Sequence, residues 1–210
     1  MGRVRSRTRM YGGRSAEERR AERRRRLLGA ALEIWGEQGW AAVTMRGVCA
    51  RAQLTDRYFY ENFADRDALL VAAWDQLRDE TVALLLDAIE RAPKEPVAQL
   101  RAAIEAFVRQ LTADPSRARI AFGEHAGSDA LERRRRDTLR TFTDLLIVAG
   151  RPYFRPDVDE DALRMSVLMG IGGFVELITA WHAGAVPADA QQIIDHSTKV
   201  GATLAIPYLP

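Results

Sequence analysis

The sequence predicts an all-α protein of about nine helices, arranged as an N-terminal three-helix head and a C-terminal helical bundle. Apolar residues recur at three- and four-residue spacing through most of the chain, which is typical of amphipathic helices. No segment shows the two-residue alternation of a strand, and proline or glycine clusters separate the periodic stretches. We expect a flexible basic arm at residues 1–14, a helix-turn-helix domain at residues 15–64 and a body at residues 65–210.

Composition describes an ordinary globular chain with an uneven charge distribution. Of its 210 residues, 47% are hydrophobic and 29% are charged, which is enough to build a sizeable core. Residues 1–66 hold 15 arginines against 8 acidic residues, whereas residues 67–210 hold 16 basic and 21 acidic residues. The positive end suits contact with phosphate. Cys49 is the only cysteine, so no intrachain disulfide forms and we expect a cytoplasmic protein. Its thiol is interpreted as a small buried filler, with redox sensing as the alternative.

The N-terminal arm and the helix after it carry most of the positive charge. Residues 1–14 contain five arginines and almost no apolar residues, which predicts a flexible arm that contacts DNA nonspecifically; a solubilising tail is the alternative. Ser15 and Glu18 have capping-box spacing and predict a helix that ends near Gly39. We expect the charged first half of this helix, including residues 23–26, to be solvated.

Residues 44–63 have the pattern of two short helices joined by a tight turn. Thr44 and Thr55 are expected to cap these helices through their hydroxyl groups. The apolar pairs Val48–Ala52 and Phe59–Phe63 lie four residues apart and should face inward. This pattern indicates a helix-turn-helix, a motif that places its second helix in a DNA groove.

Polar side chains on the other faces of this motif are candidates for DNA contact. Arg46 and Arg57 are predicted to contact bases, because a guanidinium can bridge O6 and N7 of guanine. Tyr58 and Asn62 could add contacts, and packing within the head is the alternative for the tyrosines. The full predicted DNA-binding set is Thr44, Arg46, Thr55, Arg57, Tyr58, Tyr60, Asn62 and Arg66.

Residues 27–70 closely resemble the DNA-binding domain of the TetR family of bacterial transcriptional regulators. The resemblance is carried by Ala30-Ala31-Leu32 with an aromatic after it, Gly39, the pair Thr44 and Arg46, Tyr60 with Phe63, and Arg66 followed by Ala-Leu-Leu. Gln53 departs from the pattern, since the family often has glycine there. The resemblance implies that Thr44, Tyr60 and Arg66 hold phosphate, and that the helix after Asp65 links the head to a regulatory body.

The body is expected to consist of amphipathic helices separated at prolines and glycines. A long helix starts after Asp65 and breaks near Pro93. Further helices are predicted at residues 100–111, 117–126, 130–150 and 162–184 and from Pro187 onward. The arginine run at residues 133–136 is interpreted as a solvated helix start, with a second basic contact patch as the alternative.

A small-molecule cavity between the body helices is a second expectation, since such sites are common in bundles. The predicted lining residues are Trp74, Phe107, Phe122, His125, Phe142, Met165 and Met169. Plain core packing is the alternative for each, and a structural histidine is the favoured interpretation of His125. The C-terminal GGFxELxxAWHxG pattern also resembles the TetR family, in which the last two helices form a dimer interface. The residues expected there are Gly172, Gly173, Glu176, Ile193 and Val200.

Together these features predict a homodimeric DNA-binding regulator, most simply a repressor that a small molecule releases from a palindromic operator. A constitutive or architectural DNA-binding protein is the alternative. The sequence has no metal-binding motif, no phosphate-cradling glycine loop and no nucleophile with a nearby base, so we expect neither an enzyme nor a cofactor or metal. Residues 165–183 are apolar but carry Glu176, which predicts a buried helix and no membrane association.

Overall fold

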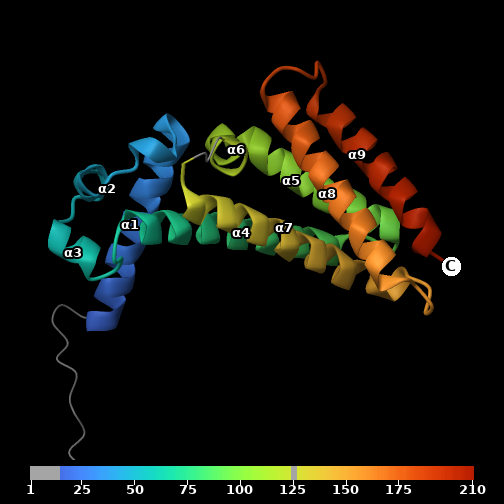
Figure 1. Ribbon diagram of the computed structural model, residues 1–210, viewed down its shortest axis with the longest axis horizontal. Coiled ribbons are helices and arrows are strands. Elements are labelled where there is room, and N and C mark those ends of the chain that lie inside the picture. The colour runs from blue at the N-terminus through green and yellow to red at the C-terminus, as the bar shows by residue number, and fades with distance from the viewer. Residues whose placement is uncertain (1–14, 124–126) are drawn as a thin grey trace, which may run out of the picture. The chain divides into compact units, whose positions relative to one another are not determined.

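A computed structural model describes residues 15–123 and 127–210, and these ranges contain only helices and connecting segments (Figure 1). The all-α prediction is confirmed. The chain divides into two compact units between Ala73 and Trp74, which we call the head and the body. The elements are α1 (Ala16–Gln38), η1 (Trp40–Ala42), α2 (Met45–Ala52), α3 (Asp56–Tyr60), α4 (Arg66–Arg91), α5 (Pro96–Ala113), α6 (Pro115–Phe122), α7 (Asp129–Gly150), η2 (Arg151–Tyr153), α8 (Glu160–His182), α9 (Ala190–Ala205) and η3 (Ile206–Tyr208). The predicted basic arm and His125 lie outside the described residues.

The helices of the head begin at the predicted caps, with one exception. Ser15 and Glu18 form the capping box of α1, and the Thr44 hydroxyl accepts from the backbone N–H of Gly47 at 3.1 Å. The Asp65 carboxylate accepts from the N–H of Ala68 at 2.7 Å at the start of α4. Thr55 has the extended backbone of an N-cap, but its side chain makes no capping hydrogen bond. Thr55 therefore occupies the expected N-cap position, but the expected hydrogen bond to its hydroxyl group does not form.

In the body, three predicted helix boundaries shift. Helix α5 already begins at Pro96, whose fixed φ suits the first turn of a helix. Pro115 does not only end α5. It also starts α6, because Asp114 caps the next turn through the N–H of Ser116 at 3.1 Å. Helix α9 begins at Ala190 and not at Pro187, since Asp189 and Gln192 form a capping box there.

The head has a closed apolar core. Helix α1 packs on η1, α2 and α3, and the predicted inward pairs Val48–Ala52 and Phe59–Phe63 are all buried. Cys49 is buried beside them, and burial together with the nearby Asp56 raises the pKa of its thiol. A buried, protonated thiol is a poor nucleophile, which supports the interpretation of Cys49 as a filler.

In the body, α5 packs along α9, α7 packs along α8, and α8 also contacts α9 (Figure 1). One cluster of buried residues joins α5, α6, α8 and α9: Val108, Leu111, Ala118, Ile178, Ile193 and Ile194. Ile193 is only 2% exposed and belongs to this core. Its predicted place in a dimer interface is therefore wrong, because its side chain is covered within a single chain.

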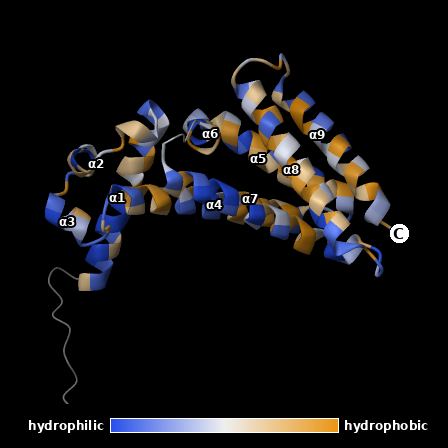
Figure 2. Ribbon diagram, viewed as in Figure 1, coloured by the Kyte–Doolittle hydropathy of each residue, from blue (hydrophilic) through white to orange (hydrophobic). Residues whose placement is uncertain are grey.

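Helix α8 was expected to be buried, and most of it is not. It is long and apolar enough to cross a membrane by length and composition alone, but only 17% of its most apolar stretch is buried. Met165 and Met169 are 61% and 72% exposed, and Gly172, Gly173 and Glu176 are exposed as well. Hydrophobic residues are prominent along α8 and α9 in Figure 2. The prediction of a buried α8 fails because one of its apolar faces has no covering element within the described chain.

Candidate nucleic-acid interface

The turn between α2 and α3 is closed by backbone hydrogen bonds and by one left-handed residue. Gln53 has φ of 51° and ψ of 47°, the conformation that glycine adopts most easily. The N–H of Leu54 donates to the carbonyl of Cys49 at 2.9 Å and so ends α2. The departure from glycine at this position leaves the turn geometry of a helix-turn-helix intact.

Arginines of α1 bind the carbonyl ends of α2 and α3, where helical carbonyls lack partners. Arg20 donates to the carbonyl of Glu61 at 2.6 Å, and Arg24 donates to that of Asn62 at 3.2 Å. Arg26 donates to the carbonyl of Ala52 at 2.5 Å. A cation at the C-terminus of a helix also interacts favourably with the helix dipole. Arg20, Arg24 and Arg26 are exposed, as expected for this charged segment, and they also bind the backbone of the motif, which the sequence alone did not indicate.

Two of the predicted DNA contacts also have partners inside the head. The guanidinium of Arg23 lies over the Tyr58 ring at 4.5 Å, a cation–π contact. The Asn62 amide donates to the Tyr58 carbonyl at 2.7 Å. Tyr58 is half-buried by this contact, so the packing alternative describes it better than free exposure does.

Arg66 was expected to hold phosphate, and the structure places it elsewhere. Its Nε donates to the Val43 carbonyl at 2.5 Å, one Nη donates to the Trp40 carbonyl at 2.7 Å, and its plane lies 5.0 Å from the Trp40 ring. These contacts fix the segment between α1 and α2 against the start of α4. The guanidinium group of Arg66 therefore binds backbone carbonyls of the head.

The remaining predicted residues are exposed and form a hydrogen-bonding surface on α2 and α3. Arg46 is exposed and has no hydrogen bond or ion pair among the described residues. Tyr60 is 61% exposed, and its ring contacts that of Phe59 in an edge-on arrangement. Arg57 is exposed and paired with Glu61 at 3.1 Å, an exchangeable surface contact. With Thr44 and Thr55, these side chains supply a cationic, hydroxyl-rich face of the kind that contacts phosphate and base edges.

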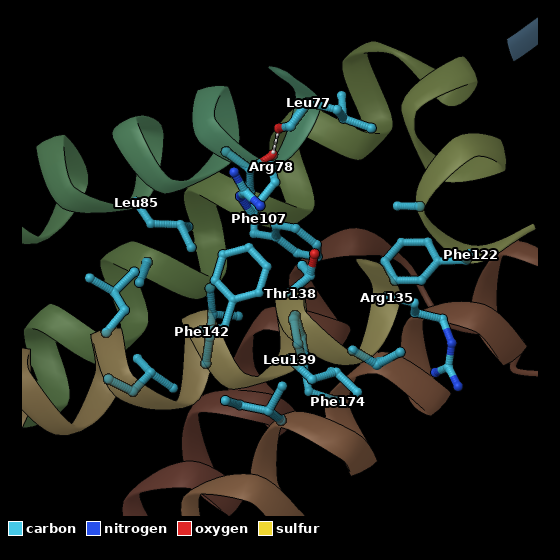
Figure 3. A pocket seen from close by; sticks show the side chains of 18 of the residues that line it. Leu77, Arg78, Leu85, Phe107, Phe122, Arg135, Thr138, Leu139, Phe142 and Phe174 are labelled. Atoms are coloured by element: carbon cyan, nitrogen blue, oxygen red, sulfur yellow. Dashed lines mark hydrogen bonds between the residues drawn. The ribbon is translucent and has the colours of Figure 1, made fainter. Parts of the chain in front are cut away.

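The body contains a cavity of about 190 Å³ that we call the α4–α7 cavity (Figure 3). Four of the predicted residues line it: Trp74, Phe107, Phe122 and Phe142. Phe107 contacts Phe122 edge-on at 6.2 Å and Phe174 at 5.7 Å, so three aromatic rings from α5, α6 and α8 form one wall. The prediction missed Phe174, although its position one turn before Ile178 on α8 marks it as inward-facing.

The two predicted methionines behave differently from the aromatic residues. Met165 lines neither of the body's two main cavities, and its 61% exposure shows that it does not face inward. Met169 borders a second cavity of about 500 Å³ and is mostly exposed. The prediction of Met165 as a lining residue is wrong because the exposed face of α8 is apolar too, so hydrophobic spacing alone could not indicate which face is covered.

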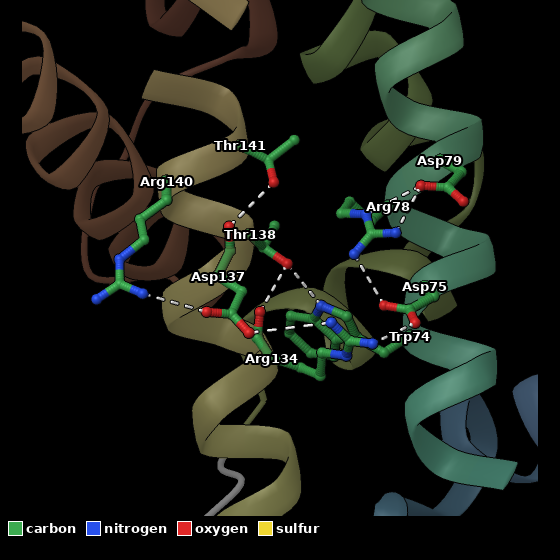
Figure 4. Close-up of polar contacts among 9 residues, drawn as sticks. All are labelled: Trp74, Asp75, Arg78, Asp79, Arg134, Asp137, Thr138, Arg140 and Thr141. Carbon is green, nitrogen blue, oxygen red and sulfur yellow. Dashed lines mark hydrogen bonds and ion pairs between the residues drawn. The ribbon is translucent and has the colours of Figure 1, made fainter. Parts of the chain in front are cut away.

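Polar side chains of α4 and α7 contact one another beside the α4–α7 cavity (Figure 4). The Trp74 indole N–H donates to the Thr138 hydroxyl at 2.8 Å, and both residues line the cavity. Next to them, Asp75 accepts from Arg134 at 2.9 Å and from Arg78 at 2.8 Å. We call these five residues the α4–α7 latch. Arg134 is therefore not part of a solvated helix start, since it reaches across to α4.

Comparison with known proteins places these observations in context. Residues 27–73 match the family model described as "Bacterial regulatory proteins, tetR family". Two solved structures, the fatty acid degradation regulator FadR from Bacillus halodurans and the transcriptional regulator FadR from Bacillus subtilis, each share 17% sequence identity with this chain. The protein from Bacillus halodurans has a TM-score of 0.69, with 84% of this chain and 96% of that chain covered. The protein from Bacillus subtilis, in complex with stearoyl-CoA, has a TM-score of 0.67, with 86% and 96% covered.

A TetR transcriptional regulator from Rhodococcus sp. RHA1 is similar at 18% identity, with a TM-score of 0.65, and 90% of this chain and 98% of that chain are covered. No curated protein sequence matches the chain. At these identities the structural likeness concerns the fold, while the family model concerns the head.

The head and its exposed polar face define a helix-turn-helix DNA-binding protein with a helical body. The family match at residues 27–73 makes the assignment more specific for the head: this segment carries the TetR-family DNA-binding domain.

Proposed function

We propose that the protein is a homodimeric repressor that leaves a palindromic operator when a small apolar molecule enters its body. The observation that carries the proposal is the position of Trp74. Its ring borders the α4–α7 cavity, its N–H bonds α4 to α7, and α4 is continuous from Arg66 to Arg91. A molecule in the cavity therefore meets the helix that begins in the head.

The cavities favour this function over the constitutive alternative. A fully packed body would support DNA binding without a switch, whereas the body holds spaces of about 190 and 500 Å³. Among the residues that the structure describes, the only charged ones lining the α4–α7 cavity are Arg78 and Arg135, and both have acidic partners, Asp75 and Glu132. An effector there gains mainly by burying apolar surface. Fatty acyl compounds are the first class to test, because one similar structure contains stearoyl-CoA.

The exposed apolar face of α8 supports the homodimer. Met165, Leu168 and Met169 form a contiguous helical stripe that water would otherwise contact, beside Gly172 and Gly173, which permit close approach of another helix. Val200 is 43% exposed on α9. We assign this surface to a second copy of the chain. Two copies would present two α3 helices, and half-sites about 34–36 Å apart would then suit one turn of DNA.

The first experiment measures binding of the purified protein to its own upstream intergenic DNA and to a scrambled duplex across a salt series. We expect sequence-preferring binding by two protomers with a steep salt dependence. Equal affinity for both duplexes would favour the architectural alternative. Absence of binding to either duplex at low salt would refute the proposal.

The switch is tested with two matched tryptophan variants. Trp74→Phe keeps a ring beside the cavity but removes the N–H that holds Thr138, so we expect operator affinity without effector to fall about 3- to 10-fold. Trp181→Phe loses a comparable bond to the Ala188 carbonyl at 2.7 Å, far along α8 and outside both cavities, and should leave operator affinity unchanged. Equal effects of the two substitutions would show that the latch carries no signal.

A further inference from the structure

The second cavity of the body is larger than the first and is bounded by α9, which does not line the first. We call it the α5–α9 cavity; it has a volume of about 500 Å³ and is lined mainly by α5, the end of α7, α8 and α9. It adjoins the α4–α7 cavity, with which it shares seven lining residues: Ile89, Leu100, Ala103, Ile104, Leu146, Ile171 and Phe174. In a single chain it reaches the surface beside Met169 and Val200, which are both exposed and belong to the surface assigned above to a second copy.

No aspartate, glutamate, lysine or arginine lines the α5–α9 cavity among the described residues. A cationic ligand would lose its hydration on entry and meet no opposite charge, and among the described lining residues an anion would meet only His196, so entry of an ion is unfavourable. The cavity therefore selects for uncharged molecules. This sets it apart from the α4–α7 cavity, where Arg78 and Arg135 contribute to the lining.

One buried hydroxyl in this cavity has no partner. Ser197 lines the cavity, is 8% exposed, and its Oγ makes no hydrogen bond. Two other hydroxyls of the lining are occupied, since Tyr208 donates to the Ala162 carbonyl at 2.9 Å and contacts Ser166 at 2.6 Å, and Tyr153 is only partly buried. On the same helix, the buried Thr198 donates to the Ile194 carbonyl at 2.7 Å. Buried polar groups in folded proteins are almost always paired, so the lone Ser197 hydroxyl indicates a partner from outside the chain.

We propose that the α5–α9 cavity binds a neutral, largely apolar molecule whose hydroxyl or carbonyl oxygen hydrogen-bonds to Ser197 Oγ. The apolar walls bury the ligand's hydrocarbon, and Ser197 fixes the position of its single polar group. This site is separate from the effector site proposed in the α4–α7 cavity and does not depend on DNA binding.

The test uses calorimetric titration of the full-length protein with 1-octanol, 1-chlorooctane and octylammonium, three probes with the same chain and different end groups. We expect 1-octanol to bind and octylammonium not to bind. Ser197→Ala should weaken 1-octanol binding about 3- to 10-fold and change 1-chlorooctane binding less than twofold. Thr198→Val is the matched control, because its hydroxyl is already paired and lines neither cavity, and it should leave 1-octanol affinity unchanged.

Thermal unfolding of the unliganded protein gives an independent readout. Removing an unpaired buried hydroxyl relieves its desolvation cost, so Ser197→Ala should raise Tm by about 2–4 °C while it weakens binding. A hydroxyl with a purely structural role would lower Tm when removed. A higher Tm together with weaker 1-octanol binding in Ser197→Ala would identify Ser197 as a ligand-binding residue.

Two filling variants locate the probe. Val167 lines only the α5–α9 cavity and Ala121 lines only the α4–α7 cavity. Val167→Phe should abolish 1-octanol binding, and Ala121→Phe should preserve it. Three outcomes would overturn the proposal. The first is that Ala121→Phe abolishes 1-octanol binding while Val167→Phe preserves it, and the second is that wild type and Ser197→Ala bind 1-octanol equally well. The third is that 1-octanol does not bind because a second copy of the chain fills the cavity. These titrations contain no DNA, so their outcomes can be interpreted even if the protein fails to bind an operator.

Discussion

The head and the body of this protein are packed in different ways. In the head, Val43, Val48, Leu69 and Leu70 are fully buried, and arginines from α1 and α4 bind the backbone carbonyls of the loops and helix ends. In the body, large rings such as Phe142 are only partly buried because they border a cavity. The head therefore presents its polar face from a well-packed scaffold, while the body keeps space that a ligand can fill.

This difference has a functional consequence. A surface that must match DNA gains from pre-organisation, because little entropy is then lost on binding. A sensor domain needs at least two arrangements of similar free energy, and incomplete packing lowers the cost of moving between them. If the two units differ in this way in solution, equivalent substitutions in the head and in the body should have unequal effects.

The largest expected difference concerns the removal of one aromatic ring from each unit. Phe59 is 1% exposed in the head, and Phe59→Ala should cost about 3–5 kcal/mol of unfolding free energy. Phe142→Ala should cost about half as much or less, because part of the ring already faces a void and makes few contacts there. Urea unfolding followed by circular dichroism measures both values. Equal costs would show that the α4–α7 cavity is closed in solution.

A smaller effect distinguishes a structural arginine from a DNA-contacting one. Arg66→Met removes the donors to the carbonyls of Trp40 and Val43, and should cost about 1–3 kcal/mol of stability. Arg46→Met should change stability by less than about 0.5 kcal/mol, because the side chain is exposed and has no partner among the described residues.

The same two variants should also differ in how their operator affinity depends on salt concentration. Arg46→Met should either lower the slope of log affinity against log salt by about one, if Arg46 contacts phosphate, or relax base preference at one position. Arg66→Met should weaken binding without changing that slope. If Arg66→Met instead lowered the salt slope and left the free energy of unfolding unchanged, Arg66 would contact phosphate, as the family resemblance implies.

The elements of the head could be predicted from the sequence because their signals are local. The spacing of Ser15 and Glu18, the threonine at position 44 and the pair Phe59–Phe63 depend on neighbours within a few residues. What could not be predicted were the contacts between distant segments. Arg26 and Arg66 look like surface cations in the sequence, and only the fold brings carbonyls 26 and 23 residues away within reach of their guanidinium groups.

In the body, hydrophobic spacing identified the helices and most of the cavity's aromatic wall, but it could not tell a covered face from an exposed one. Ile193 and Met165 both belong to apolar stripes, yet the first is core and the second is surface. Which of the two faces of α8 is covered depends on α6, α7 and α9 together. Ser197 gave no local signal either, since an unpaired hydroxyl is a property of its surroundings.

The smallest expected effect is a pH dependence confined to the body. Burial opposes ionisation of Glu80, but hydrogen bonds from Gln76 and Arg117 outweigh it and lower the pKa of the carboxyl below its ordinary value of 4.5. A lowered folded-state pKa contributes stability above the unfolded value, and this contribution is lost as the pH falls through the folded value.

Glu80→Gln should therefore reduce the body's stability at pH 7 and flatten the loss of stability below about pH 4.5. Because the Glu80 side chain is 40% exposed, solvent screening keeps the effect small. Glu90→Gln is the matched control, an exposed glutamate of the same helix with no ion pair among the described residues. Unfolding free energies of the three proteins between pH 7 and pH 3 provide the measurement. Parallel pH profiles of wild type and Glu80→Gln would mean that the bond from α6 to α4 is not formed in solution, and that the body is looser around its cavity than the structure indicates.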